Sequence, residues 1–153
     1  MGVEIERKYL VSGEAFKSLA SACHHIIQGY LCAERGRTVR VRIIDGTRAV
    51  ITIKGPASGL SRPEFEYDIP VTDAEQMCRL CTGVVIDKHR YIVSDDGNRW
   101  EVDVFHGVHE GLVIAELELP SEEYEFRLPT WIGREVTGDR RYYNSVLSGV
   151  ERD

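Results

Sequence analysis

The sequence predicts an α+β fold in which eight antiparallel strands close into a barrel, with flanking helices and a helix at the C-terminus. Segments that alternate apolar and polar residues recur along the chain, and this two-residue period is typical of strands with two different faces. Asp-Gly pairs separate neighbouring segments at two places, which favours tight hairpins. One face of strand after strand is charged, and a barrel can enclose such a face around a hydrated interior.

Length and composition indicate one domain over residues 1–153, with 42% hydrophobic residues and no repeat. The net charge of −6 gives no overall basic surface for nucleic acid or anionic membranes. No signal peptide and no apolar run of about 20 residues is evident. We therefore expect a cytoplasmic protein that binds neither nucleic acid nor membrane. Its four cysteines are expected to be reduced thiols, and no role is assigned to its histidines.

Alternating segments and turn residues place the elements in order along the chain. The expected strands lie near residues 2–10, 25–31, 38–44, 48–54, 62–70, 84–93, 99–105 and 112–119. Asp45-Gly46 joins the third strand to the fourth, and Asp96-Gly97 joins the sixth to the seventh. Helices are expected over 13–22, 72–82 and 139–148. In the second helix Thr72 and Glu75 have the spacing of a capping box, with Thr72 as the N-cap.

Residues two apart in a strand point to the same face, and here that face carries like charges in pairs. The charged set comprises Glu4, Glu6, Lys8, Arg40, Arg42, Lys54, Glu64, Glu66, Lys88, Arg90, Asp103, Glu116 and Glu118. For any single strand, an ordinary solvated sheet face explains the alternation. Like charges on one sheet face repel, however, unless an oppositely charged ligand lies between them. The whole set therefore favours a hydrated lumen that holds metal ions and a polyanion.

The order of these pairs resembles the CYTH family, also called triphosphate tunnel metalloenzymes. The opening Glu4-Ile5-Glu6-Arg7-Lys8 is similar to the family's Glu-x-Glu-x-Lys signature, and the later pairs follow in the family's order through Glu116-x-Glu118. The segment 133–144 resembles the C-terminal end of short bacterial members. The resemblance implies an eight-stranded antiparallel tunnel that acts, with a metal ion, on a triphosphate.

The resemblance also implies a role for each matching residue. It implies that Mg²⁺ or Mn²⁺ is held by Glu4, Glu6, Asp103, Glu116 and Glu118. It implies that phosphate is bound by Lys8, Arg40, Arg42, Lys54, Lys88 and Arg90. Catalytic roles would fall to Lys54 and to Glu4, Glu6, Glu116 and Glu118. Glu64 and Glu66 are candidates for orienting the cations, with Tyr30 a further candidate beside them.

The substrate expected is inorganic tripolyphosphate, which is hydrolysed to pyrophosphate and phosphate. Three alternatives stay open: a class IV adenylyl cyclase, a thiamine or nucleoside triphosphatase on the same scaffold, and a module that binds polyphosphate without cleaving it. The short chain and the few aromatic residues expected to face the lumen, Tyr30 among them, favour the smaller substrate. A carrier of apolar ligands is disfavoured because it would have an apolar lumen. The sequence does not indicate an oligomeric state.

Overall fold

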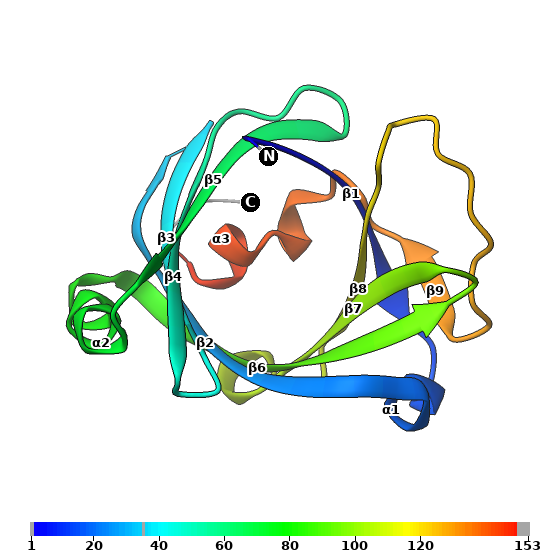
Figure 1. Cartoon of the computed structure of the whole chain (residues 1–153), viewed down its shortest axis with the longest axis horizontal. Coiled ribbons are helices and arrows are strands. Elements are labelled where there is room, and N and C mark those ends of the chain that lie inside the picture. Colours follow the sequence, from blue (N-terminus) through cyan, green and yellow to red (C-terminus); the bar gives the residue numbers. More distant parts are fainter. Residues whose placement is uncertain (1, 35, 150–153) are drawn as a thin grey trace.

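The computed structural model describes residues 2–34 and 36–149, and within these ranges nine strands form one antiparallel sheet. The strands are β1 (Gly2–Val11), β2 (Ala20–Glu34), β3 (Arg37–Ile44), β4 (Arg48–Lys54), β5 (Ser61–Ile69), β6 (Thr82–Asp95), β7 (Asn98–Phe105), β8 (Val113–Glu118) and β9 (Ile132–Glu135). The hydrogen-bonded order is β5-β4-β3-β2-β6-β7-β8-β1-β9, and β5 also pairs with β1. That last pairing closes β1 to β8 into a ring, so the predicted eight-stranded barrel is confirmed (Figure 1).

Both predicted Asp-Gly turns form. Asp45 and Gly46 have φ of 54° and 68°, and Asp96 and Gly97 have φ of 52° and 77°. A type I′ turn needs positive φ at both central residues, which Asp tolerates and Gly adopts freely. The second turn joins the paired residues Asp95 and Asn98 directly, whereas the first adds a third residue before Arg48 pairs with Ile44.

The first predicted helix is too long, since α1 covers only Ala15–Leu19. Ala20 is already extended, with ψ of 137°, and pairs with Val93 of β6. Ala20 and Ala22 therefore pair in the barrel ladder on either side of an irregularity, a long-range pairing that local sequence does not reveal. The strand predicted at 25–31 is accordingly much longer in the structure.

The predicted capping box of the second helix is wrong. Helix α2 covers Val71–Leu80, its N-cap is Pro70, and no side chain caps it. Pro70 has φ of −62° and ψ of 139°, and the ring restricts its φ to this region. The helix thus begins before Thr72, which lies inside the first turn, beyond the position where a hydroxyl can cap. Asp73 in that turn complements the helix dipole.

The predicted C-terminal helix is broken into two short turns, and they lie inside the ring of strands (Figure 1). A 3₁₀ turn, η2 (Arg140–Tyr142), is followed by α3 (Asn144–Leu147), with Tyr143 extended between them. The carbonyl of Tyr142 accepts a hydrogen bond from Lys8 Nζ at 3.1 Å, so a barrel side chain takes the place of a helical partner. We call residues 140–147 the plug.

Apolar residues pack on both sides of the barrel wall. Outside, Phe16 of α1, Trp100 and Trp131 belong to one cluster, and Ala74 of α2 packs with Val41 and Ala49 in a second. Strand β9 and the segment 119–131 also contribute to the first cluster. A third cluster, containing Ile86, Phe105 and Ile114, packs against Tyr142 and Leu147 of the plug.

Candidate functional site

The barrel encloses a polar cavity of about 540 Å³. Its wall contains Glu4, Glu6, Lys8, Tyr30, Arg40, Arg42, Thr52, Lys54, Glu64, Glu66, Arg90, Glu116 and Glu118. The plug contributes Tyr143, Asn144 and Ser145, and the connection between β4 and β5 contributes Ala57, Gly59 and Leu60. The alternating charged residues therefore face inward, as the sequence predicts.

Two predicted residues do not reach the cavity wall. Lys88 and Asp103 have side chains exposed by 0% and 2%, and Lys88 Nζ lies 2.7 Å from Asp103 Oδ2. Arg90 also binds Asp103, with both carboxylate oxygens accepting at 2.7 and 2.9 Å. These cations outweigh the effect of burial and hold the pKa of Asp103 well below its ordinary value. Both oxygens of the Asp103 carboxylate therefore already bind cationic side chains. These contacts hold Arg90 in its position at the cavity wall.

Sequence reasoning missed several wall residues. Thr38, Arg62 and Glu101 line the cavity, and each lies two residues before a predicted member of the charged set on its own strand. Extending the alternation by one step would have found them. No local signal marks Glu122 of the 119–131 segment or Tyr143 and Asn144 of the plug, because nonlocal packing brings these residues to the cavity.

Carboxylates gather where β1 runs beside β8. Glu6 and Glu118 are directly opposite each other in the register, and so are Lys8 and Glu116. Burial and the neighbouring carboxylates Glu116 and Glu4 raise the pKa of Glu6 to about 8. Burial and Glu4 also raise the pKa of Glu118. On this wall the glutamates lie close enough to oppose one another's ionisation.

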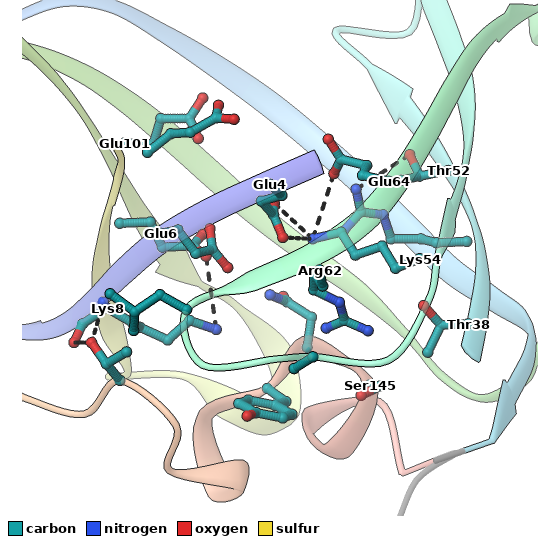
Figure 2. Close-up of a pocket in the computed structure, with 18 of the residues that line it drawn as sticks. Glu4, Glu6, Lys8, Thr38, Thr52, Lys54, Arg62, Glu64, Glu101 and Ser145 are labelled. Carbon is teal, nitrogen blue, oxygen red and sulfur yellow. Dashed lines mark hydrogen bonds and ion pairs between the residues drawn. The ribbon is translucent and has the colours of Figure 1, made fainter. Parts of the chain in front are cut away.

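Ion pairs connect this wall to the next strands (Figure 2). Lys54 Nζ lies 2.8 and 2.9 Å from the two oxygens of Glu4 and 3.6 Å from Glu64. Lys8 Nζ lies 3.7 Å from Glu116 Oε2. Burial opposes ionisation of Glu116, but the nearby cations, Lys8 foremost, outweigh it and lower its pKa to about 2. Glu116 is thus an anion across the physiological pH range.

The opposite wall carries Arg40 and Arg42, and among the described residues no carboxylate lies within 4 Å of either guanidinium, although Glu66 accepts from Thr52 Oγ1 at 2.8 Å. Arg42 Nε donates to Gln28 Oε1 at 2.8 Å, and Arg40 Nη2 contacts Thr52 Oγ1 at 3.4 Å. Arg40 Nε is buried and has no hydrogen-bond partner within the described residues. Burial and the neighbouring Arg40 lower the pKa of Arg42 to about 9. A buried, unpartnered guanidinium nitrogen beside a second guanidinium is suited to an anionic ligand.

The residues present fit a hard divalent cation in their donor chemistry. Glu4, Glu6, Glu116 and Glu118 offer carboxylate oxygens on two adjacent strands, and Mg²⁺ and Mn²⁺ prefer oxygen ligands. Bound positive charge would relieve the repulsion that raises the pKa of Glu6. In residues 2–34 and 36–149 no three acidic, histidine or cysteine side chains are already arranged as a ligand set. To hold an ion together, these glutamates would have to turn toward it.

Comparison with known proteins gives consistent results. The CYTH domain family matches residues 2–152. An "Inorganic triphosphatase" of Acetivibrio thermocellus is 51% identical over 148 residues, which is 96% of this chain and 94% of that protein. An "Inorganic triphosphatase" of Nitrosomonas europaea is 37% identical over 149 residues, which is 95% of this chain and 96% of that protein.

A solved structure described as the inorganic triphosphatase NE1496 superposes with a TM-score of 0.68 at 32% identity, covering 97% of this chain and 98% of that chain. No helix in the described part of the chain combines the length and apolar character needed to cross a membrane.

Proposed function

The chain belongs to the CYTH domain family, and we propose that it hydrolyses the terminal phosphoanhydride of inorganic tripolyphosphate with Mg²⁺ or Mn²⁺ as cofactor. The observation that carries the proposal is the division of one enclosed cavity into a carboxylate wall and a guanidinium wall. The first suits a divalent cation and the second suits phosphate oxygens. The two relatives named as inorganic triphosphatases support the same substrate class.

The cavity residues would have separate roles in this reaction. Arg40 and Arg42 would bind phosphate oxygens, and Arg90, oriented by Asp103, would add positive charge to the same cavity. Lys8 and Lys54 would pass from their carboxylate partners to the substrate as it enters. Positioning and charge neutralisation are the main demands of phosphoryl transfer.

A divalent cation at Glu4, Glu6, Glu116 and Glu118 would supply charge against the phosphate chain and make a nearby water more acidic. In the reaction, a water oxygen bonds to the terminal phosphorus as that phosphorus loses its bridging oxygen. The bridging oxygen leaves with pyrophosphate, and the water proton passes to solvent. The products are phosphate and pyrophosphate.

The test is phosphate release from tripolyphosphate, ATP and thiamine triphosphate, each with Mg²⁺ or Mn²⁺. We expect release from tripolyphosphate to be fastest and to cease when the metal is chelated. Release confined to ATP or thiamine triphosphate would assign the cavity to one of those substrates. Tripolyphosphate that binds but stays intact with either metal would identify a binding module instead.

The same assay tests the carboxylate wall through Glu116→Gln. Losing this anion removes a metal ligand and the partner of Lys8, so we expect turnover to fall at least 1,000-fold, which corresponds to about 4 kcal/mol in the barrier. The control is Glu110→Gln, because Glu110 has a side chain 73% exposed beside His106, outside the cavity. A Glu116→Gln variant with wild-type turnover would contradict the assignment.

A further inference from the structure

Three guanidinium groups line the cavity without a carboxylate partner within 4 Å among the described residues: Arg40, Arg42 and Arg62. The other cationic side chains on the wall that the sequence predicted are each paired with acid. Lys8 lies near Glu116, Lys54 is held by Glu4, and Arg90 is held by Asp103. The first two unpaired groups belong to the predicted phosphate wall. Arg62 is not in the predicted set.

The position of Arg62 is set by two strands. It lies on β5, where its Cα pairs with that of Glu4 on β1, and it precedes Glu64 on the same face. Figure 2 shows Arg62 in the same pocket as Lys54 and Glu4. Arg62 thus places a guanidinium on the side of the cavity where the carboxylates gather.

A neutral group holds this guanidinium in place. Nε and Nη2 of Arg62 donate to the carbonyl oxygen of Gly55 at 3.2 and 3.0 Å. Within residues 2–34 and 36–149, Nη1 makes no hydrogen bond, so one edge of the planar group is fixed and another is available. A carbonyl aligns the guanidinium without cancelling its full charge, and an aligned guanidinium binds phosphate oxygens at low entropic cost.

We propose that Arg62 is a third phosphate-binding arginine, which holds a phosphate of the substrate beside the carboxylate wall while Arg40 and Arg42 hold the chain from the opposite side. This inference rests on the proposed function for its substrate. A linear chain of three phosphates would then meet three guanidinium groups that have no carboxylate within 4 Å among the described residues. Sulfate or orthophosphate could occupy one of these positions, but neither could span them.

The experiment compares Arg62→Gln and Arg62→Lys with Arg48→Gln. Arg48 has a side chain 63% exposed at the start of β4 and lies outside the cavity lining, so its substitution removes the same charge without touching the site. Binding of tripolyphosphate, pyrophosphate and sulfate is measured by calorimetry in metal-free buffer, and hydrolysis of tripolyphosphate is measured with Mg²⁺. Thermal unfolding is followed with and without tripolyphosphate.

We expect Arg62→Gln to weaken tripolyphosphate binding at least 10-fold, as the loss of a charge-assisted hydrogen bond implies. Sulfate binding should change much less, and Arg62→Lys should recover part of the loss. Arg48→Gln should match wild type. Arg62→Gln should unfold at the wild-type temperature without ligand, and tripolyphosphate should raise that temperature less than it does for wild type.

Equal tripolyphosphate affinity in Arg62→Gln and Arg48→Gln would overturn the inference. So would a loss that affects sulfate and tripolyphosphate alike, because that indicates a general structural role through Gly55. If Arg62→Gln does not fold, Arg62→Lys provides the test, because a lysine ammonium cannot present the paired donors of a guanidinium to phosphate oxygens. Wild-type affinity for tripolyphosphate in Arg62→Lys would then overturn the inference. Failure of the proposed function is separate: wild type would bind tripolyphosphate without releasing phosphate, and the binding comparison would still decide the role of Arg62.

Discussion

Glu6 shows at the residue scale how burial and neighbouring carboxylates change the ionisation of a cavity side chain. Burial and two neighbouring carboxylates raise its pKa from 4.5 to about 8, so without metal it is largely protonated at neutral pH. A divalent cation must displace that proton, and its affinity should therefore rise with pH up to about 8. The residue couples metal binding to pH, although sequence alone marks it only as a conventional acid.

The same shift predicts how stability depends on pH in metal-free protein. A carboxyl group with a raised pKa in the folded state stabilises the fold while protonated, and this contribution is lost as pH rises from about 4.5 through about 8. The slope from this one group is at most about 1.4 kcal/mol per pH unit. The glutamine in Glu6→Gln cannot ionise. We therefore expect the free energy of unfolding of this variant, relative to that of wild type, to increase from pH 5 to pH 8.

Denaturant titrations at several pH values with a chelator present would measure this difference. The control is Glu123→Gln, because Glu123 is exposed on the 119–131 segment. Added Mg²⁺ should stabilise wild type more than Glu6→Gln at pH 8. Parallel pH profiles for wild type and Glu6→Gln would show that Glu6 ionises normally.

At the scale of elements, one amide ties the plug to two strands of the barrel. Asn144 Oδ1 accepts from Gln28 Nε2 and from Lys88 Nζ, each at 3.2 Å, which ties α3 to β2 and β6. The plug is short, so its own helical hydrogen bonds contribute little stability. Barrel contacts with Asn144, Tyr142 and Leu147 therefore determine its position.

Replacing this amide should loosen the plug while the barrel persists. We expect Asn144→Ala to cost about 1–3 kcal/mol, because Gln28 and Lys88 are left with unsatisfied buried groups, and to speed amide hydrogen exchange in residues 140–149. Hydrogen exchange with mass spectrometry measures both effects. Asn98→Ala is the matched control, since Asn98 Oδ1 accepts from Tyr124 and supports the 119–131 segment. Faster exchange in the same peptides for both variants would refute a separate role for Asn144.

At the scale of the whole molecule, closure makes the cavity walls interdependent. Strand β1 pairs with β5 on one side and β8 on the other, so no strand of the ring can leave without opening the lumen. Arg40 and Arg42 come from one strand of the ring and Arg62 from another, and a polyanion bound to all three would stabilise the closed form as a unit.

Tripolyphosphate should therefore protect the entire barrel in metal-free buffer. At 100 times its Kd, the ligand adds about 2.7 kcal/mol to the free energy of unfolding if it binds only the folded state. Slowly exchanging amides of both β3 and β8 should gain the same protection. Sodium sulfate at matched ionic strength is the control. Protection limited to strands on one side of the ring would show that the barrel does not unfold cooperatively.

The sequence by itself determined the barrel and the direction of its charged side chains. Alternation in Glu4, Glu6 and Lys8, repeated on later strands, assigns faces because side chains in a strand alternate strictly. The Asp-Gly turns followed from the positive φ that few residues tolerate. Both patterns are local, so they can be recognised in the sequence without knowing which distant residues pair.

Only the tertiary structure decided how deep each side chain lies and what it contacts. Alternation gives Lys88 and Arg90 the same face, yet Arg90 lines the cavity while Lys88 is fully buried against Asp103. Strand register likewise ended α1 at Leu19 and placed Arg62 beside Glu4. The plug took its broken form from contacts with Lys8 and Lys88. These outcomes depend on residues far apart in the chain, and no local period encodes their register, depth or pairing.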